Sequence, residues 1–364
     1  MTGDIAFGLS TTGSRTDRSR IAVLGMGGNE YLAGSLMRAA ERLGLQAVMF
    51  DAMEAWRGRR LMRAFNWRFR DRRPLAGPSY FSDLRDRLAR NGTEVLIATG
   101  LVPLDRGLLR ELRAIGITTV NYSTDDPWNS AMASRWFQDS LPEYDIIFTP
   151  RRANIADFER AGCRDVRYLP FGYDERLLAF DGFEALAGDV LFVGGADDDR
   201  AGFMRQFVRH GPSVALVGGY WNDYADLRAH ALGVKTWHEV AALTRAAKVN
   251  LCLVRRANRD GHVMRSLEIA ACGGCMLAED TAEHRDLFGA DDDAVRYFTT
   301  AEEAAQRARA LIADRPARER LAARLRRRVG SANHSYVDRV ATMVDAACAL
   351  PQRRAVAGRD EAGC

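Results

Sequence analysis

The sequence predicts an α/β protein made of two doubly wound domains, each with a parallel sheet, and a ligand cleft between them. Three observations lead to this class. Short apolar runs alternate with amphipathic stretches of about a dozen residues, which is the pattern of parallel strands connected by helices. A glycine turn follows the first apolar run of each half. The chain has 364 residues, which suits two domains of about 100–200 residues each.

Composition narrows the class further. The apolar fraction is 47%, the charged fraction is 27% and the net charge is +4, so the chain is globular and its charge does not by itself indicate nucleic-acid binding. Lys235 and Lys248 are its only lysines. Arginine also covers solvated helix faces, so we attribute this bias mainly to base composition. No run of about 20 apolar residues and no signal-peptide hydrophobic region is present, so we expect a cytoplasmic protein.

The six cysteines are scattered and do not have the spacing of a disulfide framework. Cys272 and Cys275 form a C-x-x-C pair, but neither a second ligand pair nor a preceding redox-type strand accompanies them. We expect both to be buried thiols.

The first domain is expected at residues 20–180, after a disordered lead-in at residues 1–19. It opens with a strand at Ile21–Leu24, a glycine turn, an amphipathic helix and a second strand. Such an opening is typical of dinucleotide-binding proteins, but Glu30 stands where their fingerprint needs its third glycine, and a carboxylate there would repel a pyrophosphate. We expect either a loop that brings backbone close to another ligand of the cleft or a plain tight turn. The glycines of this loop are Gly25, Gly27 and Gly28.

Residues 56–73 interleave eight arginines with Trp56, Phe65, Trp67 and Phe69. This composition is typical of a surface that binds nucleic acid or an anionic membrane. The alternative, which we favour, is a solvated amphipathic helix whose aromatic side chains face the core.

The rest of this half continues the alternation. Strands are expected in EVLIATG, TTVNYSTDDP, YDIIFTP and VRYLPFGYD, and helices at residues 81–90, 106–115 and 130–137 and in ANIADFERAG. Ligands of parallel sheets bind at the carboxyl ends of the strands, so Gly100, Asp125, Asp126 and Thr149 are expected at the edge of the cleft. The adjacent Asp125 and Asp126 supply a general base or an acceptor for a sugar hydroxyl, or else cap a helix ahead of Pro127.

The second domain is expected at residues 181–335. Its strands are expected in DVLFVGG, SVALVGGYW, KVNLCLV, CMLAED and AVRYF, with helices between them and a further short strand at the start of VKTWHEV. Residues 301–350 predict helices that are interrupted at SANHSY. We expect residues 336–350 to form a C-terminal helix that packs back on the first domain, and residues 351–364 to be a frayed tail.

One stretch of the second half, DGHVMRSLEIAACGGC (residues 260–275), stands out. A polar loop with a single arginine passes into a short apolar helix that has one carboxylate near its start. Helix N-termini attract anions. We therefore expect an anion site here, with Glu268 beside it to accept hydroxyl protons.

These motifs resemble a known family. LFVGG followed by Arg200, VALVGGYW, KVNLCL, RSLEIAACGGCML, DLFG and HSY are similar to the C-terminal domain of GT-B glycosyltransferases of group 1, in particular the CgeB-like (spore maturation protein) branch. The first half is similar to that branch in its G-x-G-G opening, its DDP and its YDIIFTP. The resemblance covers about residues 20–345 and implies the GT-B fold, with two Rossmann-like domains: an N-terminal one for the acceptor and a C-terminal one for a nucleotide-sugar.

The resemblance also implies roles for individual residues. Glu268 would accept hydrogen bonds from the ribose. Asp260 would lie near the sugar, although the family carries Glu at this position. Arg265 would bind the diphosphate together with Arg200. The remaining donor-side residues are the backbone N–H groups of Gly261, His262 and Val263 and the turn of Gly194 and Gly195.

Arginines and a helix N-terminus stabilise a departing diphosphate without a metal, so we expect no metal requirement and treat the runs Asp197–Asp199 and Asp291–Asp293 as solvated loops. The resemblance favours retention of configuration. An inverting enzyme would use Asp125 or Asp126 as the base. His262 is a further catalytic candidate, with a simply hydrogen-bonded ring as its alternative. The remaining aromatic candidates, which flank the nucleobase or belong to the core, are Trp221, Trp237 and His238.

The sequence therefore predicts a hexosyltransferase-like enzyme that transfers a sugar from a nucleotide-diphosphate-sugar, its co-substrate, to an unknown acceptor, without another cofactor. The arginine-rich segment at residues 56–73 is compatible with a phosphate-bearing or lipid-linked acceptor. It is also compatible with a peripheral contact between this segment and the inner membrane face. No specific nucleic acid is expected. The alternative is a non-catalytic nucleotide- or polyanion-binding protein of the same fold. An NAD-dependent oxidoreductase is disfavoured by Glu30.

Overall fold

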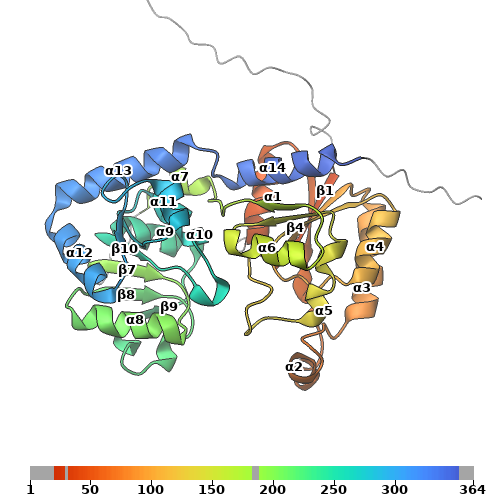
Figure 1. Cartoon of the computed structure of the whole chain (residues 1–364), viewed down its shortest axis with the longest axis horizontal. Coiled ribbons are helices and arrows are strands. Elements are labelled where there is room, and N and C mark those ends of the chain that lie inside the picture. Colours follow the sequence, from red (N-terminus) through yellow and green to blue (C-terminus); the bar gives the residue numbers. More distant parts are fainter. Residues whose placement is uncertain (1–19, 29–31, 183–187, 352–364) are drawn as a thin grey trace, which may run out of the picture.

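The computed structural model describes residues 20–28, 32–182 and 188–351 and contains two separate six-stranded sheets (Figure 1). The expected lead-in at residues 1–19, Glu30 and all but the first residue of the expected tail lie outside the described residues. Every strand pairing in both sheets is parallel. Helices cover both faces of each sheet, as the alternating pattern predicts.

The first sheet has the strand order β2-β1-β3-β4-β5-β6. Its central strands are apolar throughout because helices bury both of their faces; in β1, Ile21, Val23 and Leu24 are at most 1% exposed. The strands are β1 (Arg20–Gly25), β2 (Gln46–Asp51), β3 (Val95–Thr99), β4 (Thr118–Tyr122), β5 (Ile146–Thr149) and β6 (Val166–Tyr168). The helices of this half are α1 (Leu32–Arg42), α2 (Arg60–Phe69), α3 (Gly77–Arg90), α4 (Arg106–Ala114), α5 (Arg135–Gln138), α6 (Arg152–Arg160) and α7 (Arg176–Ala179).

The second sheet has the order β12-β11-β10-β7-β8-β9. Its strands are β7 (Val190–Val193), β8 (Val214–Val217), β9 (Ala231–Gly233), β10 (Val249–Cys252), β11 (Met276–Glu279) and β12 (Arg296–Phe298). The helices that follow in this half are α8 (Asp198–Arg209), α9 (Trp237–Ala246), α10 (Met264–Cys272), α11 (Ala282–Phe288), α12 (Ala301–Ala313), α13 (Arg315–Ser331) and α14 (Tyr336–Ala349).

Both sheets reverse their winding direction once. In the first sheet the chain goes from β1 outward to β2 and then returns to β3 on the other side of β1. In the second it goes from β7 outward to β8 and β9 and then returns to β10 on the other side of β7. Connections diverge at such a switch point and leave a crevice at the carboxyl ends of the two strands. Each domain therefore has one place that its topology prepares for a ligand.

The C-terminal helix returns to the first sheet, and Figure 1 shows α14 lying over that half of the molecule. Tyr336, Val340 and Met343 of α14 belong to the same buried cluster as Ile21 and Val120 of the sheet. The expected interruption at SANHSY is present: α13 ends at Ser331 and α14 begins at Tyr336.

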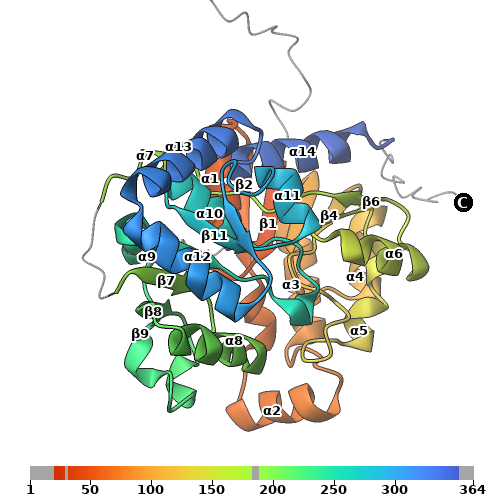
Figure 2. The same ribbon diagram turned by 60° about the vertical axis from the view of Figure 1, so that its left-hand side comes forward.

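Two local expectations are wrong. The helix expected at residues 130–137 is reduced to α5, because the Asn129 carbonyl accepts hydrogen bonds from the N–H groups of Met132 and Ala133 and the preceding chain forms a turn. The aromatic residues of α2 do not face the core. Asn66 is the only buried residue of this helix, and Phe65 and Phe69 are 52% and 71% exposed. Figures 1 and 2 both show α2 projecting from the first domain.

The thiols of Cys272 and Cys275 are buried as expected, and burial raises the pKa of each to about 12. Both thiols are therefore protonated at neutral pH, whereas redox or metal chemistry would require a thiolate. No described helix is both long enough and apolar enough to cross a membrane.

Candidate functional site

A cavity of about 160 Å³ opens at the switch point of the second sheet, at the carboxyl ends of β7 and β10. Arg200 and Arg265 both line it. These are the two arginines that the family resemblance assigns to a diphosphate. Arg200 comes from the first turn of α8 and Arg265 from the first turn of α10. The other lining residues are Phe192, Val193, Leu251, Cys252, Leu253, Val263 and Met264.

Arg200 is held in place but not neutralised. Its Nη1 donates to the Gly195 carbonyl at 3.0 Å and its guanidinium lies over the Phe192 ring at 5.6 Å. Its buried Nε has no hydrogen-bond partner among the described residues. Burial lowers the pKa of the Arg200 guanidinium, because a desolvated cation without a close carboxylate is costly. An anion in the cavity would relieve that cost.

Arg265 and Glu268 form an ion pair one turn apart on α10, with 2.6 Å between Nη1 and Oε2. The side chains are 29% and 15% exposed. Arg265 lines the cavity, whereas Glu268 lies behind it and is not part of the lining. The carboxylate fixes the guanidinium beside the helix N-terminus, which itself favours anions.

Of the three backbone N–H groups that the resemblance assigns to the donor in the loop before α10, one is already used. The Val263 N–H donates to Ser266 Oγ at 3.1 Å and is already used as a helix cap. A Cβ at Gly261 would lie 2.5 Å from Glu283 Cδ, so this glycine is required for packing against Glu283. Gly194 and Gly195 also act indirectly: their carbonyls accept from Trp221 Nε1 and Arg200.

Asp260 is not where a sugar-binding residue would be. It forms an ion pair with Arg151, which comes from the other domain, and the two side chains are 3% and 2% exposed. Burial raises the pKa of Asp260, although the neighbouring guanidinium opposes this. The expected contact of Asp260 with the sugar is therefore replaced by a buried contact between the domains.

Asp125 and Asp126 differ sharply. Asp126 is 1% exposed and accepts from four donors: two nitrogens of Arg259, the amide of Asn154 and the Trp128 N–H. It is thus a turn cap and an interdomain ion-pair partner, and its expected role as a base does not fit this geometry. Asp125 is half-buried, and no described donor pairs with its carboxylate. Of the two, only Asp125 is free to meet a ligand.

His262 is completely buried between two partners. Its Nε2 accepts from the Phe171 N–H at 3.1 Å, so Nδ1 carries the proton and donates to Glu283 at 2.6 Å. Both ring nitrogens are occupied, and the role expected for His262 in catalysis is not supported. Trp221 is also fully buried and belongs to the core.

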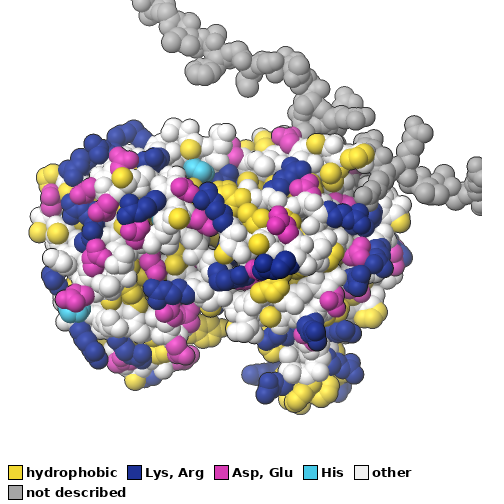
Figure 3. Space-filling model, viewed as in Figure 1, with side chains coloured by type: hydrophobic (Ala, Val, Ile, Leu, Met, Phe, Trp, Pro, Cys, Tyr) yellow, Lys and Arg dark blue, Asp and Glu magenta, His cyan; other side chains and the backbone are white. Residues whose placement is uncertain are grey.

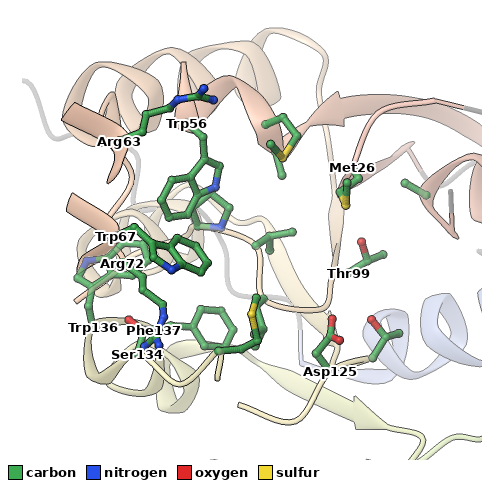
Figure 4. A pocket seen from close by; sticks show the side chains of 18 of the residues that line it. Met26, Trp56, Arg63, Trp67, Arg72, Thr99, Asp125, Ser134, Trp136 and Phe137 are labelled. Atoms are coloured by element: carbon green, nitrogen blue, oxygen red, sulfur yellow. The ribbon is translucent and has the colours of Figure 1, made fainter. Parts of the chain in front are cut away.

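A second and larger cavity, of about 800 Å³, lies at the switch point of the first sheet. Met26 after β1 and Thr99 at the end of β3 border it, together with Asp125. Figure 4 shows these three at one end and Trp67, Trp136 and Phe137 at the other. Its wall is mostly apolar: it includes Trp56, Leu32, Ala33, Ala52, Met53, Ala64, Leu101, Val102, Pro103 and Met132, with Arg60, Arg63 and Arg72 from α2 and the loop after it.

The glycine loop shapes this end of the cavity. A Cβ at Gly25 would lie 2.4 Å from Thr99 Oγ1, so only glycine lets β1 pass this close to β3. The Gly27 N–H donates to Asp51 Oδ1 at 3.1 Å, which ties the loop to the end of β2. Contacts within the protein, rather than the approach of a ligand to the backbone, thus account for the glycines at positions 25 and 27.

The two cavities share one residue. Met264, at the first position of α10, lines both of them. A ligand in the second sheet's crevice and one in the first sheet's crevice would therefore meet beside the N-terminus of α10.

Sequence reasoning missed several of these residues. Trp136 and Phe137 come more than ten residues after the end of a strand. The rule that ligands bind at the carboxyl ends of strands therefore does not select them. Met264 could have been found, because it directly precedes Arg265. Arg151 follows β5 and could have been found by the rule that selected Thr149.

Comparison with known proteins supports the architecture. Residues 199–345 match the family model described as "Glycosyl transferase-like". The match includes Arg200, Arg265 and Glu268, and it agrees with the expected enzyme class. No match was found among curated proteins.

Three solved structures share the fold over nearly their whole length. Sucrose-phosphate synthase from Thermosynechococcus elongatus has a TM-score of 0.65 and 13% identity, covering 90% of this chain and 98% of that chain. Anabaena HepE in complex with UDP and glucose has a TM-score of 0.60 and 12% identity, covering 91% and 100%. The UDP-forming α,α-trehalose-phosphate synthase from Burkholderia vietnamiensis has a TM-score of 0.57 and 14% identity, also covering 91% and 100%. The expected GT-B fold is confirmed.

Proposed function

We propose that this protein is a glycosyltransferase that binds a nucleotide-diphosphate-sugar in the cavity of the second sheet and its acceptor in the cavity of the first. One observation carries the proposal: the two cavities lie at the switch points of their sheets and share Met264. Within this scheme, residues 20–180 with the helix at 336–350 serve the acceptor and residues 181–335 serve the donor. The CgeB-like branch of group 1 is the proposed relationship.

The donor cavity suits the chemistry of a leaving diphosphate. Transfer breaks the bond between the anomeric carbon and a phosphate oxygen and leaves negative charge on the diphosphate. Arg200, Arg265 and the N-terminus of α10 are directed at this charge and would stabilise it in the transition state. Glu268, which fixes Arg265, is proposed to accept from the ribose hydroxyls. We propose a metal-independent reaction with retention of configuration.

Uracil is the proposed base, because one structural neighbour was solved with UDP-glucose and another is named as UDP-forming. The test is thermal unfolding of the full-length protein with UDP, GDP, ADP, dTDP and their glucose conjugates. A ligand that binds the folded state alone raises the melting temperature as its concentration rises. We expect stabilisation by UDP and UDP-glucose without added metal.

Three variants sharpen the test. Arg200→Met and Arg265→Met should each lose most of the nucleotide-induced stabilisation, since each removes a charge-assisted hydrogen bond to phosphate. Arg209→Met, at the exposed end of the same helix as Arg200, should retain it. If the two cavity variants respond to every nucleotide as the wild type does, the donor site is misplaced.

The second candidate is a non-catalytic protein that binds a polyanion through α2. It rests on exposed arginines of this helix and of the residue before it: among described residues, no ion-pair partner is found for Arg59, Arg60, Arg63 and Arg68. A salt-sensitive affinity for RNA, without turnover of any nucleotide-sugar, would favour it.

We also propose a peripheral contact of residues 56–73 with the inner, anionic face of the cytoplasmic membrane. Leu61, Phe65 and Phe69 follow one another at helical spacing on the outward side of α2 and are each more than half exposed. Figure 3 shows hydrophobic and basic side chains together on this projecting part. Sedimentation with anionic vesicles that is lost in Phe65→Ser/Phe69→Ser would support it; equal sedimentation with neutral vesicles would contradict it.

A further inference from the structure

We propose that the acceptor is an anionic amphiphile: a compound with a long apolar body, a hydroxyl group at one end and a carboxylate or phosphate at the other. This inference rests on the proposed function, because it assigns the acceptor of that reaction. It places the hydroxyl at Asp125, the apolar body along the aromatic wall and the anionic group near Arg60 and Arg63. Figure 4 shows Asp125 and Arg63 on opposite sides of the cavity.

The size and lining of the cavity indicate an apolar ligand body. Its volume of about 800 Å³ falls within the ~300–1,000 Å³ of small-molecule sites. A sugar acceptor would need polar groups along its whole length, because each buried hydroxyl without a partner is costly. Here apolar side chains form most of the wall, and they include three tryptophans, one phenylalanine and four methionines. Methionines adapt to ligands of irregular shape.

The end of the cavity next to α10 has the groups that a hydroxyl requires. The Asp125 carboxylate has no described donor, and Thr99 and Thr124 lie beside it in the lining. A hydroxyl bound there would donate to Asp125, and its oxygen would point towards the donor side at Met264. The acceptor oxygen bonds to the anomeric carbon as the carbon–phosphate oxygen bond breaks. The electron pair of that bond leaves with the diphosphate. The hydroxyl proton, which is hydrogen-bonded to Asp125 before the reaction, turns to a phosphate oxygen of this leaving group as the new bond forms.

The far end has positive charge without local compensation. Arg60 and Arg63 line the cavity from the inner side of α2, and neither has an ion-pair partner in the described part of the chain. Arg72 has a different role. It stacks on Trp67 at 5.5 Å and donates to the Ala131 and Ala133 carbonyls, so it builds the wall. An anionic group of the ligand would thus face Arg60 and Arg63.

The wall formed by α2 is fixed before any ligand binds. After the helix, Asp71 and Arg72 both have left-handed backbone angles (φ 52° and 57°), which non-glycine residues adopt rarely. Asp71 is stabilised there because its carboxylate accepts from the N–H groups of Arg135 and Trp136, the first residues of α5. The loop after α2 is thereby attached to the helix that carries Trp136. A preformed site of this kind lowers the entropic cost of binding.

Calorimetry on the full-length protein tests the inference with defined probes. 12-Hydroxydodecanoate has all three features, dodecane-1,12-diol lacks the anionic group, and maltose lacks the apolar body. Dodecyl phosphate and dodecanoate compare the two anionic groups. We expect 12-hydroxydodecanoate to bind more tightly than the diol by about tenfold at low salt, with the difference shrinking as salt is added. Preferential binding of maltose, or equal affinities for the diol and the hydroxy acid, would overturn the inference.

A matched pair of variants locates the site. Ala64 lines the cavity from α2, whereas Leu61 is 84% exposed on the other side of the same helix. Ala64→Trp should fill the cavity and weaken 12-hydroxydodecanoate binding about tenfold or more. Leu61→Trp adds the same side chain to the same helix and should leave the affinity for the dissolved probe unchanged. Equal affinities in the two variants would show that the probe binds elsewhere and would refute the assignment.

The failure of this inference is separable from that of the proposed function. Nucleotide-induced stabilisation should be the same in Ala64→Trp and wild type, because Ala64 does not line the donor cavity. Nucleotide binding without any binding of 12-hydroxydodecanoate refutes the acceptor class alone. Binding of the probe without any response to nucleotides supports the ligand class of the cavity and refutes the transferase.

Discussion

Replacing Asp260 by asparagine tests whether this residue holds the domains together or binds sugar. Asp260→Asn preserves the shape of the side chain but removes its charge, which leaves the Arg151 guanidinium buried without a carboxylate. The two side chains are 3% and 2% exposed, so solvent screens the pair very little. Removing one partner of a buried ion pair costs ~3–5 kcal/mol.

Arg151 keeps two other bonds, to the carbonyls of Ser123 and Thr124, so we expect the lower end of that range, ~3 kcal/mol. With ~2.1 cal/mol/K of unfolding entropy per residue, a chain of 364 residues should lose about 4 °C in melting temperature.

The measurement is thermal and urea unfolding of Asp260→Asn, Arg151→Met and the double variant. The double variant should recover part of the loss, since it leaves no unpaired charge in the interface. A change below ~1 kcal/mol in Asp260→Asn, together with loss of nucleotide-sugar binding, would refute the interdomain role and restore the sugar contact implied by the family resemblance.

Two further predictions concern pH and the two adjacent carboxylates. Burial lowers the pKa of His284 from 6.5 to about 4, so the folded state binds fewer protons than the unfolded state between these pH values. The contribution of His284 to the free energy of unfolding is therefore complete above about pH 6.5 and is lost as the pH falls towards 4. Between pH 7.5 and 5 the loss should be ~2 kcal/mol. Urea unfolding at these two pH values should show a smaller loss for His284→Gln than for wild type, and equal losses would contradict the assignment. Asp126→Ala should cost ~1–3 kcal/mol of unfolding free energy, because it leaves the buried Asn154 amide without its acceptor and Arg259 with Asp157 as its only carboxylate partner. Asp125→Ala should change stability by less than ~0.5 kcal/mol yet raise the KM for the acceptor. The reverse order of stabilities would show that the two roles are exchanged.

Local sequence patterns were sufficient to locate most of the strands and the two arginines of the smaller cavity. Parallel strands buried on both faces appear as continuous apolar runs, so β1, β3, β5, β7 and β10 are recognisable without a structure. Arg200 and Arg265 follow strand and loop signals that are close to them in the chain.

Long-range contacts could not be predicted in this way. Asp260 lies 109 residues from its partner Arg151, and no periodicity connects them. The helical period correctly groups Leu61, Phe65 and Phe69 on one face of α2, but it does not say whether that face meets a core or solvent. Only the packing of the rest of the domain decides this, and here it leaves the face uncovered.

The contacts between the domains explain why adjacent aspartates acquire different roles. Arg151 after β5 pairs with Asp260, and Asp126 after β4 pairs with Arg259 at 2.6 Å. Both connections attach the carboxyl edge of the first sheet to the loop that leads into α10. They therefore set the position of the α10 N-terminus, and of Met264, relative to the larger cavity. A carboxylate used for this purpose must be buried and fully paired. Asp125, which lines the larger cavity and has no partner among the described residues, is left available to a ligand there.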